Sequence, residues 1–195
     1  MYKLIGSPKT RAIRVVWMLE ELGLDYEIDP AGPHSDAVLS ANPSGKVPAL
    51  KVGDDVIIDS VAICQYLADK HNKLTYPAGG IQRAQQDSWT HYALDDVDSI
   101  LWFNAKNTFV LPEELRSEKA REACRSNSTN RWPFWISGSA TVTMSWATNS
   151  LFPILCWAIA LAGRSMAQDG PFQQDVSPTT SIVCDRVQPA FARLR

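Results

Sequence analysis

The sequence predicts a mixed α/β domain over residues 1–72 and an all-α domain over residues 81–195, joined by a linker at residues 73–80. Two observations predict this division. Before residue 72, short apolar runs alternate with helical patterns and turns, starting as strand, helix, strand and ending as a hairpin and a helix. From residue 81 to about residue 104, apolar residues keep helical spacing instead. A strand–helix–strand unit followed by a hairpin predicts a mixed sheet that helices cover.

The first unit begins with residues 2–5, a short apolar strand that stops at the Gly6-Ser7-Pro8 turn. Residues 11–22 carry one apolar stripe at helical spacing, and Gly23 follows as a residue that readily adopts the positive φ of a helix end. Residues 26–28 predict the next strand, and a weak helix covers residues 36–41.

The second unit is a hairpin and a helix. Residues 47–52 and 56–58 predict two strands around the turn at residues 53–55. Asp59 or Ser60 caps a helix over residues 61–70. Pro48 lies just inside the first of these strands, where a trans proline removes one ladder donor. A cis Val47–Pro48 bond would instead turn the Val47 amide and carbonyl outward, free to pair with the backbone of a ligand.

Composition excludes several classes of function. The net charge of −2 gives no reason to expect a nucleic-acid partner or an anionic membrane surface. The four cysteines are scattered without CxxC pairs, so we expect neither a metal site nor a disulfide framework. The first residues show no basic stretch followed by an apolar run, and the setting predicted is cytoplasmic.

Four stretches of the chain form a series of motifs: Ser7-Pro8-Lys9-Thr10-Arg11, Asn42-Pro43-Ser44-Gly45-Lys46-Val47-Pro48-Ala49-Leu50, Asp59-Ser60-Val61-Ala62-Ile63 and Tyr66-Leu67-Ala68. In this order and spacing they resemble the N-terminal domain of glutathione transferases. The resemblance is specific over about residues 1–70 and continues more weakly to about residue 125.

The resemblance implies a thioredoxin-like fold with a cis Pro48 and a site for glutathione as co-substrate. Lys46, Val47 and Pro48 would hold the peptide, with Val47 pairing to its cysteinyl backbone. Asp59 would bind the γ-glutamyl ammonium group and Ser60 its carboxylate, at a helix N-terminus. Asp59 and Ser60 also fit a plain N-cap, and both roles are compatible.

The resemblance places hydroxyls at Ser7 and Thr10, where thioredoxins carry Cys-x-x-Cys, so dithiol chemistry is not available. A hydroxyl that donates a hydrogen bond to the glutathione sulfur favours the thiolate. Ser7 is the first candidate for this catalytic donor, as in serine-type transferases, and Thr10 the second. His34 fits a solvated loop residue or a ligand of the glycine carboxylate. Cys64 fits a core residue better than a reactive one.

The second domain is predicted to begin with a long helix over residues 81–104, and a helix restarts at Leu111-Pro112-Glu113-Glu114. In the family this region lines the pocket for the electrophile. Trp102, Phe103 and Phe109 fit that role or simple core packing.

Residues 126–167 are atypical. They contain only two charged residues, Arg131 and Arg164, and their helical periodicity is poor. A slip of the coding frame would explain this, because plausible codons for residues 126–135 read one base earlier permit FEFDKSLAVL. The same reading of residues 143–153 permits YVMGDKFSVPD, which supplies the Ser-x-x-Asp capping pattern that the family expects there.

The predicted function is conjugation of the glutathione thiolate to small electrophilic substrates, by a homodimer. One alternative is a non-enzymatic glutathione- or protein-binding module of the same fold. Another is a glutathione-dependent isomerase or reductase.

Overall fold

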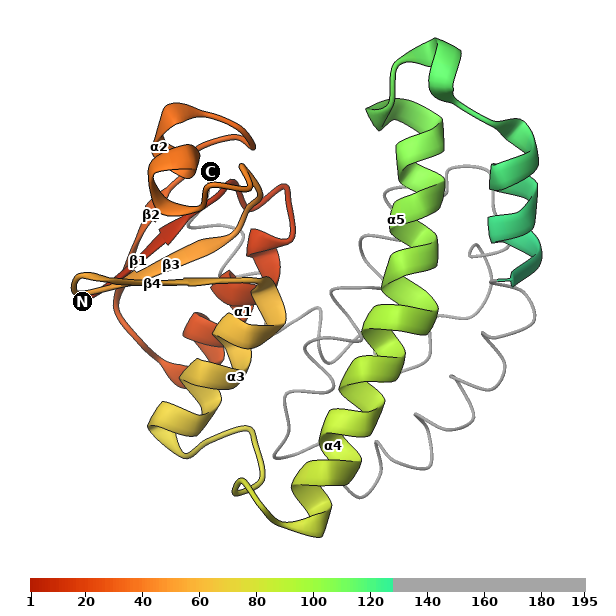
Figure 1. Cartoon of the computed structure of the whole chain (residues 1–195). Coiled ribbons are helices and arrows are strands. Elements are labelled where there is room, and N and C mark those ends of the chain that lie inside the picture. Colours follow the sequence, from red (N-terminus) through yellow and green to blue (C-terminus); the bar gives the residue numbers. More distant parts are fainter. Residues whose placement is uncertain (128–195) are drawn as a thin grey trace. The chain divides into compact units, whose positions relative to one another are not determined.

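The computed structural model describes residues 1–127 of the 195-residue chain. These residues fall into two compact units, Met1–Thr75 and a second that begins at Tyr76 (Figure 1). The atypical stretch predicted at residues 126–167 lies almost wholly outside the described residues. Within residues 1–127, no helix is both long and apolar enough to cross a membrane.

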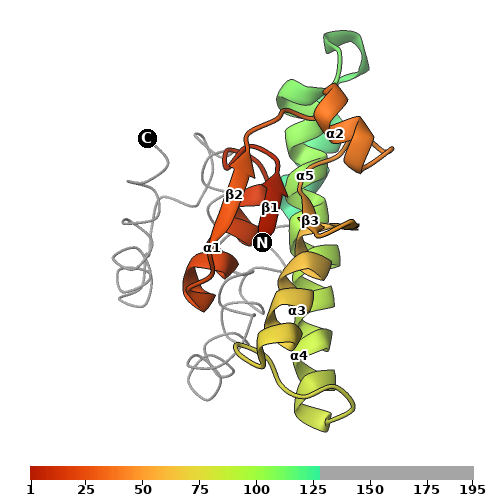
Figure 2. The same cartoon turned by 90° about the vertical axis from the view of Figure 1, so that its left-hand side faces the viewer.

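The first unit is built on a four-stranded mixed sheet of order β2-β1-β3-β4 (Figures 1 and 2). Its strands are β1 (Tyr2–Ile5), β2 (Tyr26–Asp29), β3 (Ala49–Val52) and β4 (Asp55–Ile58). β1 pairs in parallel with β2 and antiparallel with β3, and β3 pairs antiparallel with β4. The predicted mixed sheet is therefore confirmed, although β3 begins at Ala49 and not at residue 47 as predicted.

Three helices cover this sheet: α1 (Ala12–Leu22), α2 (Asp36–Ala41) and α3 (Ser60–His71). Ile5 and Ala49 pack with Val38 of α2. Leu4 and Leu50 are their neighbours in the strands, so their side chains point to the opposite face, where they are fully buried. Each such leucine contributes about 1.5–3 kcal/mol to folding. A mixed sheet with the strand order β2-β1-β3-β4 and helices on both faces is the thioredoxin-like α/β fold.

The second unit is helical throughout its described part. One rod contains α4 (Ile81–Tyr92), α5 (Ser99–Ala105) and the π-helical segments η1 (Ala93–Asp98) and η2 (Lys106–Val110) (Figure 1). The predicted helix over residues 81–104 is thus confirmed but runs further, to Val110. The two π turns were not predicted.

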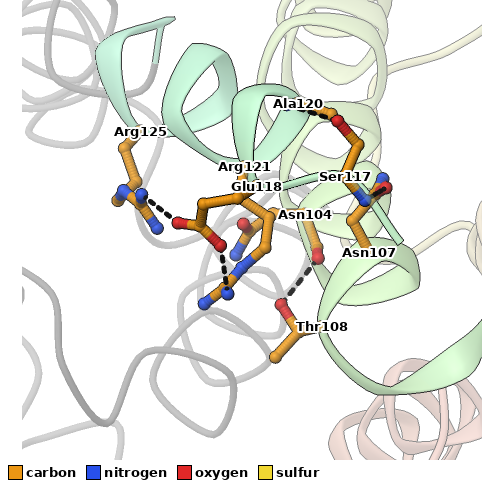
Figure 3. Close-up of polar contacts among 8 residues, drawn as sticks. All are labelled: Asn104, Asn107, Thr108, Ser117, Glu118, Ala120, Arg121 and Arg125. Atoms are coloured by element: carbon orange, nitrogen blue, oxygen red, sulfur yellow. Dashed lines mark hydrogen bonds and ion pairs between the residues drawn. The ribbon is translucent and has the colours of Figure 1, made fainter. Parts of the chain in front are cut away.

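The chain after this rod corrects one prediction. The helix predicted to restart at Leu111 is wrong, because residues 113–115 form only the 3-10 turn η3 (Glu113–Leu115). The next helix occupies residues 118–127. Ser117 accounts for this later start, since its Oγ accepts a hydrogen bond from the amide of Ala120 at 3.2 Å (Figure 3). The amide of Ser117 in turn donates to Asn107 Oδ1 of η2 at 3.1 Å.

Ion pairs line the helix that follows Ser117. Glu118 bonds Arg121 at 2.6 Å and Arg125 at 2.7 Å (Figure 3). The hydrogen bond from Arg125 lowers the pKa of Glu118. The side chains of Glu118 and Arg125 are exposed and that of Arg121 is partly exposed, so these ion pairs add little to stability.

Candidate functional site

Three loops of the first unit meet at one edge of the sheet. Ile5 of β1 pairs with Ala49 of β3, and Ala49 pairs with Ile58 of β4, so these residues form one row across the strands. Two residues beyond that row, along their strands, the chain reaches Ser7, Val47 and Ser60. The register therefore brings the three predicted segments to the same end of the sheet.

A close approach confirms that the first two loops are adjacent. Gly6 has φ 140°, and a Cβ on it would lie 3.1 Å from the Cβ of Val47. Only glycine combines this backbone angle with this contact. Gly6 thus lets the Ser7 loop lie directly against the segment before β3.

In the Ser7 loop the two candidate hydroxyls differ in their partners. Thr10 Oγ1 donates to the carbonyl oxygen of Ser7 at 2.6 Å and accepts from the amide of Ala12 at 3.2 Å. Ser7 Oγ accepts one long bond from the amide of Lys9 at 3.3 Å, and within residues 1–127 its hydrogen has no acceptor. The Thr10 hydroxyl is therefore used to start α1, whereas the Ser7 hydroxyl keeps its proton available.

The segment before β3 presents unpaired backbone. The Val47–Pro48 bond is cis, as the sequence resemblance implies. β3 begins only at Ala49, two residues later than predicted. Among the described residues, neither the amide nor the carbonyl of Val47 has a hydrogen-bond partner. Val47 therefore offers one donor and one acceptor at the edge of the sheet.

Hydrogen bonds and packing from Asn42 and His34 hold the turn that precedes Val47. Asn42 is buried, and its Nδ2 donates to the carbonyl of Lys46 at 2.8 Å while its Oδ1 accepts from the amide of Ser44 at 3.1 Å. The amide of His34 donates to the carbonyl of Gly45 at 2.8 Å. The His34 ring lies against Gly45, where an added Cβ would come within 2.1 Å of Nδ1. Sequence reasoning missed Asn42 as a support, although an Asn-Pro-Ser-Gly turn is a strong signal for an Asx turn.

Asp59 caps α3. Its Oδ1 accepts hydrogen bonds from the amides of Val61 at 2.9 Å and Ala62 at 3.1 Å. Its backbone has φ 73° and ψ 126°, a combination that is rare for a residue with a side chain. The predicted cap is therefore confirmed at Asp59. The side chain is exposed, and its other oxygen has no partner among the described residues.

Ser60 lies under the surface. It is 3 % exposed, and its Oγ accepts a hydrogen bond from Arg14 Nη1 at 3.2 Å. Arg14 is itself 2 % exposed. Sequence reasoning missed this arginine, because a charged residue on an amphipathic helix is ordinarily assigned to its outer face. The available signal was its position inside the apolar run from Ala12 to Val16.

Cys64 is a core residue, as interpreted from the sequence. Burial raises its pKa to about 12. Its thiol donates to the carbonyl of Arg14 at 3.6 Å. A protonated thiol in this position has no nucleophilic role.

Comparison with known proteins identifies the unit that carries these loops. Residues 10–70 match the family described as "Glutathione S-transferase, N-terminal domain". Residues 10–70 are therefore similar to the N-terminal domain of glutathione S-transferases. The match includes Thr10, the cis Pro48 and the Asp59–Ser60 pair.

Individual glutathione S-transferases are similar to the chain over different lengths. Glutathione S-transferase 3 of Zea mays is 43% identical over 75 residues, which are 35% of this chain and 34% of the maize protein. The chain thus spans about a third of the length of that relative. Glutathione S-transferase GstA of Escherichia coli O157:H7 is 29% identical over 172 residues, or 82% of this chain and 83% of the relative.

A solved glutathione S-transferase shows the same fold. The theta class enzyme from Xanthomonas axonopodis pv. citri, determined with glutathione bound, has a TM-score of 0.67 and 22% identity. The superposition covers 100% of this chain and 92% of that chain. The sequence resemblance and the predicted fold class are confirmed by these comparisons.

Proposed function

We propose that this chain binds glutathione at the sheet edge of its first unit and transfers the thiolate to small electrophiles. One observation carries the proposal. In the region that matches the glutathione S-transferase N-terminal domain, Val47 has unpaired backbone groups and lies against Gly6, the residue before Ser7 with its available hydroxyl. An extended peptide that carries a thiol complements this pair of features.

The tripeptide is held at three points. The Val47 amide and carbonyl pair with the cysteinyl backbone of glutathione, next to Pro48. The free oxygen of Asp59 binds the γ-glutamyl ammonium group, while Ser60 and the N-terminus of α3 bind its carboxylate. Lys46, which is exposed, and His34 are the candidate ligands for the glycine end of the tripeptide.

The chemistry requires a thiolate. A cysteine thiol has a reference pKa of about 8.5, so most of it is protonated near neutral pH. Ser7 Oγ donates a hydrogen bond to the sulfur, and the N-terminus of α1 adds partial positive charge. The proton leaves to solvent. The sulfur lone pair then forms the new bond to an electrophilic carbon, and the leaving group departs with the electron pair of the broken bond.

The remaining expectations belong to the same proposal. The electrophile is small and reactive, and Trp102, Phe103 and Phe109 are candidates for its pocket. Phe103 and Phe109 are 46% and 56% exposed, a level that fits contact with a ligand better than core packing. A homodimer in the cytoplasm is the expected working form.

Affinity retention and turnover together test the proposal. We expect the full chain to bind glutathione-agarose and to conjugate glutathione to 1-chloro-2,4-dinitrobenzene. Ser7→Ala should keep retention and lose most turnover. Retention without turnover in the unmodified chain would favour the non-enzymatic binding module. Absence of retention by folded protein would contradict the proposal.

A further inference from the structure

The last part of the rod in the second unit carries one charge among apolar and neutral side chains. Between Asp98 and Glu113, Lys106 is the only charged residue in the sequence. It is the first residue of η2, which continues α5. Phe103 and Phe109 lie three residues to either side of it, and they are 46% and 56% exposed. A single cation thus belongs to a surface segment with two accessible aromatic rings.

The Lys106 ammonium contacts one of these rings. Its Nζ lies 5.2 Å from the centroid of the Phe103 ring, which is within the range of a cation–π interaction. Lys106 is only partly exposed, yet it forms no ion pair and its ammonium donates no hydrogen bond to another residue in the described range 1–127. This part of the chain therefore offers the cation an aromatic face but no anion.

A ligand that is both aromatic and anionic complements these two groups. Its ring can stack on the exposed Phe103 in an offset or edge-to-face arrangement. Its negative charge can pair with the Lys106 ammonium, and apolar rings around such a pair screen it less than open water does. A neutral aromatic ligand would use the ring alone, and an aliphatic anion would use the charge alone.

We propose that this chain prefers aromatic electrophiles that carry an anionic substituent such as a carboxylate, and that Lys106 selects them. This inference rests on the proposed function, which assigns Phe103 and Phe109 to the electrophile. The glutathione sulfur forms the new bond to the ring carbon that carries the leaving group, and that group departs with the electron pair of the broken bond. Lys106 pairs with the substituent and takes no part in these bond changes.

This role predicts how Lys106 acts on the kinetics. Its contact with a substituent that does not react is the same in the substrate complex and in the transition state. Such uniform binding lowers KM and leaves kcat as it is. Salt screens a partly exposed charge pair. The preference should therefore lie in KM, depend on a positive charge at position 106 and weaken as salt is added.

Two chloroaromatic substrates that differ in one charge test the preference. 4-Chloro-3,5-dinitrobenzoate carries a carboxylate, whereas 4-chloro-3,5-dinitrobenzamide is neutral and of nearly the same size. Steady-state kinetics of the full chain at saturating glutathione give kcat/KM for each, and the ratio of the two values is compared between variants so that their different intrinsic reactivities cancel. We expect Lys106→Met to lower the benzoate-to-benzamide ratio about fivefold, the upper end for an exposed ion pair, through KM. Lys106→Arg should keep the ratio of the unmodified chain.

Controls separate this contact from a general effect of charge or folding. Lys119→Met removes the same charge from an exposed position in the helix over residues 118–127, and the ratio should stay as it is. Phe103→Ala should raise KM for both substrates, because both stack on that ring. Thermal unfolding verifies that each variant is folded. Added salt should lower the ratio in the unmodified chain, a measurement that needs no variant.

The outcomes distinguish the inference from the function beneath it. A ratio that neither Lys106→Met nor salt changes, or that Lys119→Met lowers equally, would overturn the role of Lys106 while conjugation stands. Unchanged KM values in Phe103→Ala would place the electrophile elsewhere and overturn the inference as well. Failure of the folded, unmodified chain to conjugate either substrate would instead contradict the proposed function.

Discussion

The hydroxyl of Thr10 donates a hydrogen bond to the carbonyl oxygen of Ser7 at 2.6 Å. The same oxygen of Thr10 accepts from the amide of Ala12 at 3.2 Å. Thr10 therefore holds the loop and the start of α1, and Ser7 is the residue with a hydroxyl free to act. This relationship separates the two candidates that the sequence left open.

The first prediction contrasts these two hydroxyls. Ser7→Ala should lower kcat/KM by about 10- to 100-fold, since a hydrogen bond to a charged group contributes about 1.5–3 kcal/mol. Thr10→Val should keep most of the turnover but lower the free energy of unfolding by about 1–2 kcal/mol, because two hydrogen bonds disappear. Steady-state kinetics and urea denaturation check the pair. The reverse pattern would make Thr10 the thiolate partner.

The second prediction separates the two roles of Asp59. Asp59→Asn keeps an oxygen to cap the amides of Val61 and Ala62, so stability should change little, but it removes the charge that binds ammonium. Glutathione affinity should then fall several-fold. Asp59→Ala should lose the same affinity and about 1 kcal/mol of stability as well.

Thermal unfolding and calorimetric titration of both variants measure these effects. Full glutathione affinity in Asp59→Asn would show that the residue is only a cap.

The third prediction concerns the contact between Gly45 and His34. Gly45→Ala should destabilise the chain by more than about 1 kcal/mol, because the residue has φ 69° and its Cβ would overlap the His34 ring. Gly53 supplies the matched control. It has φ 62° with nothing within 4 Å of an added Cβ, so Gly53→Ala reports the backbone cost alone.

His34 also has a positive φ, of 61°, so its own replacement must be measured separately. In a His34→Ala background, Gly45→Ala should cost only about as much as Gly53→Ala, measured by urea denaturation. Equal costs for Gly45→Ala and Gly53→Ala would argue that the ring does not pack on Gly45.

The fourth prediction is that Cys64 is inert in the folded chain. Its pKa of about 12 follows from burial, so at pH 8 almost none of it is thiolate. Iodoacetamide at that pH should leave Cys64 unmodified in native protein and modify it in urea, as peptide mass mapping will report. Rapid labelling of Cys64 in the native state would contradict its assignment to the core.

Sequence reasoning located the sheet well because each strand is a short apolar run between strong turn signals. Errors at strand ends have local causes. β3 begins at Ala49 rather than Val47, since Pro48 has no amide hydrogen for the ladder. The resemblance to glutathione transferases supplied the cis Pro48, which apolar periodicity alone does not reveal.

Other features were beyond pattern reasoning. A π turn adds one residue to a helix without changing its composition. The spacing of the apolar residues therefore did not predict η1 and η2. The helix predicted at Leu111 rested on Pro112 and two acids, but Ser117 provides the cap and starts the helix later. Arg14 is buried with a hydrogen bond to Ser60, which is 46 residues away in the sequence. Tertiary contacts of this kind decide a charged residue's place more than helix periodicity does.

The most direct test of the account follows the ultraviolet absorbance of the glutathione thiolate against pH, with glutathione bound to the full chain and with Ser7→Ala in parallel. We expect the bound thiol to ionise with a pKa about one to two units below its reference value of about 8.5, and Ser7→Ala to reverse much of this shift. A midpoint for bound glutathione equal to that of the free thiol would contradict the central claim that Ser7 stabilises the thiolate.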